Sequence, residues 1–145
     1  MAGVLFDSSV YINFLRNDDL SIMSRRRRST AAALSQTVHL SAVVLEELYA
    51  GATDARARKV ISKLESEFAN VGRLLVPNLS DWSLTGQVLA EIGKKYGYQI
   101  IKRSRMTNDC LIALSARRAG LVVITHNAKD FRIISEFRRF GFEEV

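Results

Sequence analysis

This sequence contains a single cysteine, two histidines and one proline among its 145 residues. One cysteine excludes an intrachain disulfide and a zinc site built from several thiolates. His39 and His126 lie far apart in the chain, which argues against a histidine-rich metal site. No apolar run approaches the roughly 18 residues that span a bilayer, and the N-terminus lacks the basic region of a secretory signal. We therefore expect a cytoplasmic protein without a membrane segment.

Basic residues outnumber acidic ones, with 21 Lys and Arg against 15 Asp and Glu, so the net charge is +6. Such a surplus favours polyanionic partners, nucleic acid first, although a solvated surface alone can produce it. The hydrophobic share of 48% and the charged share of 25% are those of a globular protein. The length predicts one domain over residues 1–145.

Short apolar segments alternate with amphipathic helical segments along the chain. The expected strands are Val4–Phe6, Val38–Ser41, Arg73–Val76, Leu121–Ile124 and Phe142–Val145. This alternation predicts an α/β/α sandwich with a central, mainly parallel sheet of four or five strands. Ligands of such sheets bind at the carboxyl ends of the strands. We therefore look for functional residues directly after the expected strands.

Two segments between the strands are strongly basic. Arg25–Arg28 are four consecutive arginines in an expected helix and would point to every side of it. They would either contact phosphates or form a solvated surface. Residues 97–105 form the most loop-like segment, and its basic residues are Lys102, Arg103 and Arg105. Because this loop leads into the next helix, it is better placed than the arginine run to hold a phosphate backbone.

Acidic residues follow expected strand ends or lie in the first turns of expected helices. Asp7 directly follows the first strand, and Asp109 lies in the first turn of a helix that starts near Thr107. Both positions have a structural explanation, because carboxylates cap helices and are stabilised near helix N-termini. Asp130 lies three residues after Asn127, which is compatible with a capping box.

Glu47 is singled out by its position on a helix. In the segment VVLEELYAG a helical wheel places Glu47 between Val43 and Val44, on the flank of the apolar face, and places Glu46 nearly opposite that face. A solvated charge suits Glu46, whereas a carboxylate at the position of Glu47 requires a ligand or a basic partner. Both alternatives for Glu47 stay open at this point.

Several carboxylates at one edge of a sheet repel one another, and their ionisation in a half-buried cleft is costly. A hard divalent cation removes this cost. Oxygen ligands without histidine or cysteine favour Mg²⁺ or Mn²⁺ over zinc. Such an ion polarises a phosphoryl group and activates water near neutral pH. The acidic residues together therefore indicate a metal-dependent site that acts on phosphates.

Three stretches resemble the PIN-domain family, most closely the VapC-type ribonuclease toxins of type II toxin–antitoxin systems. They are LFDSSVYINFL, LSAVVLEELYAG and NDCLIALSARRAGLVVITHNAKDF, which occur in the family's order and span nearly the whole chain. The resemblance implies a PIN-like fold and a Mg²⁺- or Mn²⁺-dependent endoribonuclease that cuts single-stranded RNA. It also implies a homodimer and neutralisation by a cognate VapB-type antitoxin.

Carried over by position, the resemblance makes Asp7, Glu47 and Asp109 the metal ligands and catalytic carboxylates. Glu47 takes this role because it begins the Glu-Leu-x-x-Gly pattern of the family. Ser9 and Thr125 correspond to hydroxyl residues that support the acidic site. The Lys102, Arg103 and Arg105 segment then becomes the expected RNA-binding surface.

The fourth acidic position departs from the family pattern. Many relatives have an aspartate where Asn127 stands. Either Asp130 serves as the fourth catalytic carboxylate, which we favour, or Asn127 orders a water in a site of three carboxylates. The departure also leaves open an alternative function, a PIN-like module that binds RNA or an antitoxin and cuts weakly or not at all.

Overall fold

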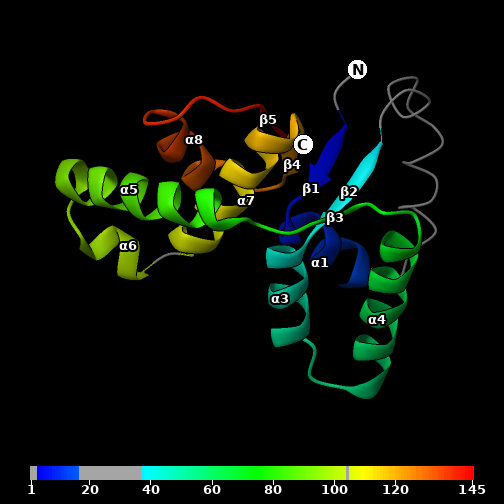
Figure 1. The fold of residues 1–145 in the computed structure, drawn as a ribbon. Coiled ribbons are helices and arrows are strands. Elements are labelled where there is room, and N and C mark those ends of the chain that lie inside the picture. Colours follow the sequence, from blue (N-terminus) through cyan, green and yellow to red (C-terminus); the bar gives the residue numbers. More distant parts are fainter. Residues whose placement is uncertain (1–2, 17–36, 104) are drawn as a thin grey trace.

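The computed structural model describes residues 3–16, 37–103 and 105–145, and Figure 1 shows their arrangement. Its centre is a five-stranded sheet in which every neighbouring pair of strands is parallel, in the order β3-β2-β1-β4-β5. The strands are β1 (Val4–Phe6), β2 (Val38–Ser41), β3 (Leu74–Leu75), β4 (Val122–Thr125) and β5 (Phe142–Glu144). The expected parallel sheet is confirmed. The arginine run Arg25–Arg28 lies outside the described residues.

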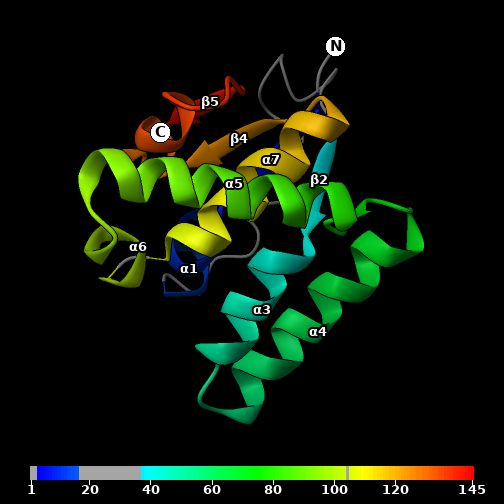
Figure 2. The same cartoon turned by 60° about the vertical axis from the view of Figure 1, so that its left-hand side comes forward.

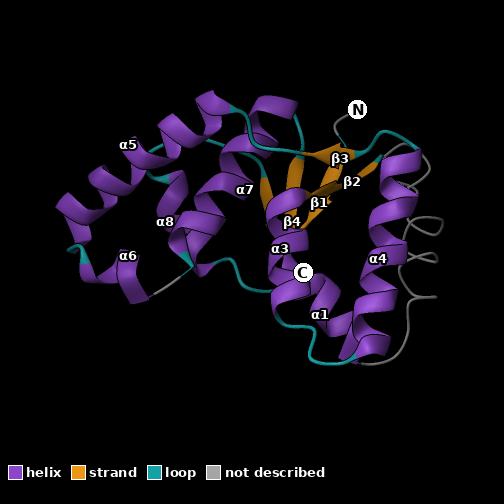
Figure 3. Cartoon of the chain, turned by 60° about the horizontal axis from the view of Figure 1, so that its bottom comes forward, coloured by secondary structure: helices purple, strands orange, loops and turns teal. Residues whose placement is uncertain are grey.

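Helices cover both faces of this sheet. They are α1 (Ser8–Arg16), α3 (Ala42–Ala50), α4 (Ala55–Asn70), α5 (Leu79–Tyr96), α6 (Gln99–Arg103), α7 (Met106–Ala119) and α8 (Lys129–Ser135). In Figure 3 the strands lie between α4 on one side and α7 on the other, with α5 beyond α7. The predicted α/β/α sandwich is therefore confirmed. None of these helices, within the described residues, is long and apolar enough to cross a bilayer.

The core lies where the sheet meets α7. Leu5, Leu40 and Val123 from three neighbouring strands are completely buried, as expected for parallel strands covered on both faces. Helix α7 is buried over almost its whole middle part because it lies between the sheet and helices α5 and α8 (Figure 2). A helix enclosed in this way holds its first turn in a fixed position relative to the strand ends.

The chain order of the strands reverses between β1 and β4. From β1 the chain continues to β2 and β3 on one side, and it then returns through α5, α6 and α7 to β4 on the other side. The Asp7 N–H donates to the Ile124 carbonyl at 2.8 Å, which keeps the two strands paired up to their ends. A pocket lies at these strand ends, which is where ligands bind in parallel sheets.

Two expected local features are wrong. The segment 97–105, expected as a loop, contains the helix α6, and Ile100 and Ile101 pack against the core. Helix α8 begins at Lys129, with Ala128 as its N-cap and no side-chain cap hydrogen bond. The capping box expected between Asn127 and Asp130 is therefore not formed.

Candidate active site

The Asp7 carboxylate accepts hydrogen bonds from one hydroxyl of α1 and from one hydroxyl at the end of β4. Ser9 Oγ and Thr125 Oγ1 donate to Asp7 Oδ2 at 3.0 and 2.9 Å. Each hydroxyl in turn accepts a backbone N–H of the loop after β4, from His126 at 3.0 Å and from Asn127 at 3.0 Å. The carboxylate is thereby oriented by the start of α1 and the end of β4, and both hydroxyl residues that the resemblance assigns to the support of the acidic site contact it.

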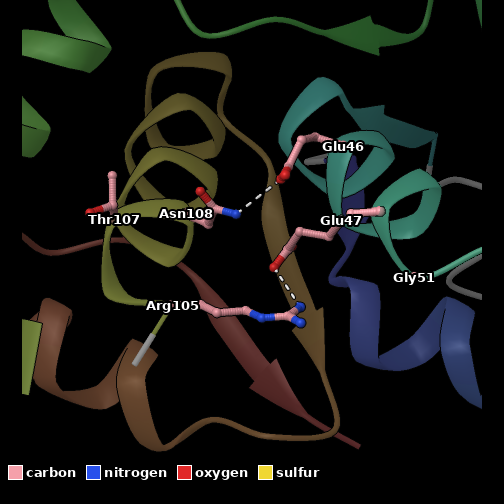
Figure 4. Close-up of a pocket in the computed structure, with 7 residues that line it drawn as sticks. Glu46, Glu47, Gly51, Arg105, Thr107 and Asn108 are labelled. Carbon is pink, nitrogen blue, oxygen red and sulfur yellow. Dashed lines mark hydrogen bonds and ion pairs between the residues drawn. The ribbon is translucent and has the colours of Figure 1, made fainter. Parts of the chain in front are cut away.

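Glu47 projects from α3 toward the same region and is buried, whereas Glu46 is exposed, as the helical wheel predicted. Its Oε2 accepts a hydrogen bond from Arg105 Nη1 at 3.1 Å (Figure 4). Its other oxygen, Oε1, is buried without a hydrogen-bond partner among the described residues. Burial raises the pKa of Glu47, an effect that the hydrogen bond from Arg105 opposes and the charge of Asp7 reinforces.

Asp109 and Asp130 add two half-buried carboxylates from the first turns of α7 and α8. Burial, followed by the charges of Asp7, Asp130 and Glu47 and a hydrogen bond with the Asp130 side chain, raises the pKa of Asp109 to about 8. Burial disfavours the charged form of the Asp109 carboxyl, and the neighbouring negative charges disfavour it further. The four carboxylates therefore act on one another electrostatically.

One pocket of about 350 Å³ brings the acidic residues together. Its lining includes the four carboxylates and their immediate neighbours, namely Asp7, Ser8, Ser9, Ile12, Glu47, Arg105, Asp109, Asn127 and Asp130. Residues separated by more than 120 positions thus meet at the carboxyl ends of β1 and β4. Asp130 and Asn127 both line the pocket, so both alternatives for the fourth position remain compatible with the geometry.

The donor set fits a hard divalent cation. The pocket offers carboxylate oxygens and no sulfur or imidazole ligand, which suits Mg²⁺ or Mn²⁺. The buried, unpartnered Glu47 Oε1 is an oxygen for which a cation would be a partner. In the part of the chain that is described, however, no three acidic, histidine or cysteine side chains are arranged to hold one ion, and Glu47 is turned toward Arg105. Participation of Glu47 as a third ligand would therefore require its side chain to turn away from Arg105.

Cys110 neighbours Asp109 in α7 but is not a nucleophile in this site. The side chain is buried, and this burial, together with the charges of Asp109 and Asp130, raises the pKa of the thiol to about 12. The thiolate is the reactive form of cysteine, so the group is inert near neutral pH. The chemistry of the pocket therefore rests on oxygen ligands.

The basic residues expected to bind RNA are in different environments. Lys102 is exposed on α6, and the side chain of Arg103 is outside the described part of the structure. Arg105 lines the carboxylate pocket itself. Sequence reasoning missed this ion pair with Glu47, because the two residues are 58 positions apart and no local spacing connects them.

A parallel α/β/α sandwich with four carboxylates around one pocket at the strand ends defines the class of this domain. The model of the PIN domain family matches residues 4–136, and the chain therefore belongs to the PIN domain family. This result confirms the family resemblance of the three sequence stretches. No curated protein sequence matches the chain.

Solved structures of VapBC complexes share the fold. DNA-bound VapBC from Salmonella typhimurium has a TM-score of 0.68 at 23% identity, covering 99% of this chain and 98% of that chain. VapBC2 from Rickettsia felis, bound to a promoter DNA fragment, has a TM-score of 0.66 at 20% identity, covering 98% of both chains. VapBC-1 from nontypeable Haemophilus influenzae has a TM-score of 0.63 at 22% identity, covering 97% and 96%. At these identities the likeness concerns the fold.

Proposed function

We propose that this protein is a Mg²⁺- or Mn²⁺-dependent endoribonuclease and the toxin of a VapBC-type toxin–antitoxin pair. The observation that carries this proposal is the pocket lined by Asp7, Glu47, Asp109 and Asp130 at the strand ends of a PIN domain. The net charge of +6 supports an RNA substrate, because the acidic pocket then lies in a chain that attracts polyanions.

The reaction would be hydrolysis of an RNA phosphodiester by water. One P–O bond forms to the attacking water, and the P–O bond to the leaving ribose oxygen breaks. A bound Mg²⁺ or Mn²⁺ supplies Lewis-acid polarisation of the phosphate and activates water near neutral pH. Asp7 and Asp109 would hold the ion, with Ser9 and Thr125 fixing the orientation of the Asp7 carboxylate.

Glu47 would either hold the ion with them or orient the attacking water. Its Oε1, which has no hydrogen-bond partner among the described residues, would serve in either role once the side chain turns away from Arg105. Asp130 would supply the fourth carboxylate, and its position beside Asp109 supports this assignment. Asn127, which lines the same pocket, would order a water if Asp130 does not act directly.

A cognate VapB-type antitoxin would bind next to this site. A second pocket of about 340 Å³ is lined largely by apolar residues of α1, α3 and α4, including Ile12, Leu15, Leu48 and Ile61. It shares Ile12 and Glu47 with the carboxylate pocket, so an apolar segment bound there would lie against the catalytic residues. The similar folds of chains from VapBC complexes support such a partner. The homodimer remains a proposal that rests on the family resemblance.

Cleavage of single-stranded RNA by the purified protein in Mn²⁺, with and without a chelator, tests the proposal. We expect cleavage that the chelator abolishes and that Asp7→Asn and Asp109→Asn both lack. Glu67→Gln is the matched control, because it removes an exposed carboxylate of α4 away from the pocket. RNA binding without any cleavage in Mg²⁺ or Mn²⁺ would instead support the alternative of a catalytically inactive binding module.

A further inference from the structure

Arg105 and Glu47 form an ion pair with one end in water and the other end buried. The Arg105 side chain is 68% exposed and the Glu47 side chain is 3% exposed, and their closest atoms are 3.1 Å apart. Figure 4 shows the guanidinium reaching from the residue before α7 to the glutamate of α3. A side chain that is mostly in water has other conformations available at low cost, so this contact is easily exchanged.

The pairing is also incomplete. Arg105 satisfies only Oε2 of Glu47, and the buried Oε1 has no partner among the described residues. A permanent counterion for a buried carboxylate is expected to satisfy both oxygens, because an unsatisfied buried acceptor destabilises the protein. The contact with Arg105 is therefore the kind that a ligand able to bind both oxygens of Glu47 would replace.

The ion pair lies between two pockets. The carboxylate pocket is on one side, and a pocket of about 320 Å³ lined by Glu46, Ala50, Gly51, Thr107 and Asn108 is on the other. Arg105 and Glu47 line both of them. A single RNA strand bound in both pockets would have to pass the guanidinium of Arg105.

The backbone of Arg105 is held in place while its side chain remains free to turn. The Arg105 carbonyl accepts the Asp109 N–H at 2.9 Å, which ties the residue to the first turn of α7. A change of side-chain partner therefore does not require movement of Asp109. The Arg105 side chain can therefore release Glu47 while the Arg105 carbonyl keeps its hydrogen bond with the Asp109 N–H.

We propose that Arg105 is a positioning residue with two alternative partners: Glu47 in the cation-free site, and a phosphate of the RNA once a divalent cation holds Glu47. The inference rests on the proposed function of the same site. The guanidinium stays charged throughout and its planar fork matches phosphate oxygens. The exchange also keeps charges balanced, because the cation replaces the arginine at the carboxylate and the phosphate replaces the carboxylate at the arginine.

Competition for Glu47 has a measurable consequence. A ligand that binds only one conformation of its site has an apparent affinity that falls in proportion to the fraction of molecules in that conformation. Arg105 therefore weakens cation binding to the RNA-free protein. Removal of the arginine should strengthen cation binding, and only as long as Glu47 is present.

Calorimetric titration of the purified, chelator-treated protein with Mn²⁺ tests this competition. We expect Arg105→Ala to tighten Mn²⁺ binding by about three- to tenfold. In a Glu47→Gln background the same change should alter the affinity by less than about twofold. Lys129→Ala is the control, because it removes an exposed positive charge next to Asp130 without touching Glu47, and it should also have little effect.

Two results would overturn the exchange. The first is an unchanged or weakened Mn²⁺ affinity in Arg105→Ala, and the second is equal tightening with and without Glu47, which reflects general electrostatics alone. Absence of saturable Mn²⁺ binding in the unmodified protein would instead contradict the proposed function itself.

Binding of labelled single-stranded RNA, measured by fluorescence anisotropy in Ca²⁺ and in EDTA, tests the second partner. Ca²⁺ serves as a carboxylate-binding ion, and the RNA is checked for integrity on a gel. We expect Arg105→Ala to weaken RNA binding several-fold in Ca²⁺ and little in EDTA, where the arginine is occupied by Glu47. Arg105→Lys should restore part of the affinity, because it keeps the charge without the fork. An equal loss in both conditions would contradict the exchange of partners.

Discussion

Two carboxylates of this protein are buried and paired with an arginine, yet their surroundings differ. Asp81 in α5 accepts hydrogen bonds from Arg118 Nε on both oxygens, at 3.1 and 3.0 Å, and from the Asn78 N–H at 2.9 Å. Its partner Asn78 caps α5 and completes a capping box. Glu47 accepts a hydrogen bond from Arg105 on Oε2, and its buried Oε1 has no hydrogen-bond partner within the part of the chain that the structure describes.

This difference distinguishes Asp81, a carboxylate that stabilises the fold, from Glu47, a carboxylate of the candidate active site. Every oxygen of Asp81 has a partner, so this carboxylate stabilises the start of α5 and its contact with α7. Glu47 is instead placed near Asp7 and Asp109, and its environment raises its pKa. An incompletely satisfied carboxylate among like charges indicates a site that is built for a ligand.

Loss of catalysis is the largest effect that we expect. Asp109→Asn should reduce RNA cleavage at least about a hundredfold, the loss typical of removing one group that stabilises charge in a transition state. The metal-free variant should be as stable as the unmodified protein or more so, because the substitution removes a carboxylate from mutual repulsion. Single-turnover cleavage rates and urea unfolding measure the two outcomes, and cleavage at the unmodified rate would exclude Asp109 from the site.

Isosteric neutralisation of the two paired carboxylates should give opposite stability effects. Asp81→Asn should lower the free energy of unfolding by about 1–2 kcal/mol, because Arg118 and the Asn78 N–H lose a charged acceptor. Glu47→Gln should leave it unchanged or raise it, since the exposed Arg105 is solvated without its partner. Urea denaturation in EDTA gives both values, and a larger loss for Glu47→Gln would make Glu47 a structural residue.

The stability of the metal-free protein should depend on pH in the direction set by Asp109. Its pKa is raised from 3.8 to about 8, so the folded state binds a proton that the unfolded state has released between these values. Stability is therefore greatest at the acidic end of this range and falls as the pH rises toward 8. Melting temperatures in EDTA from pH 5 to pH 9 should decline less in Asp109→Asn, and parallel profiles would contradict the shifted pKa.

The smallest expected effect concerns Lys102, an exposed residue of α6. If it contacts one RNA phosphate, Lys102→Ala should reduce the slope of log affinity against log salt by about 0.7. The slope is obtained from RNA binding at several salt concentrations. An unchanged slope would remove α6 from the RNA path.

Much of the site follows from local patterns in the sequence. An apolar segment ending on Asp7 indicates a buried strand followed by a polar strand end, and the helical wheel alone distinguishes the buried Glu47 from the exposed Glu46. These inferences succeed because strand burial and helical periodicity are properties of neighbouring residues. The alternation of elements similarly determines the parallel sheet.

Features that depend on distant contacts could not be predicted in this way. The Arg105–Glu47 pair joins segments that only the complete fold brings together. The Asn127-x-x-Asp130 spacing indicated a capping box, but Thr125 and Glu144 bind the N–H groups of Asn127 and Ala128 instead.

The central claim is that carboxylates from four segments form one divalent cation site. Calorimetric titration with Mn²⁺ near pH 7, in buffers of different ionisation enthalpy, measures the affinity and the protons released together. We expect saturable binding with release of about one proton, because burial and the neighbouring carboxylates raise the pKa of Asp109 to about 8, and we expect loss of this release in Asp109→Asn. Absence of saturable binding, or binding that Asp7→Asn and Asp109→Asn leave unchanged, would contradict the central claim.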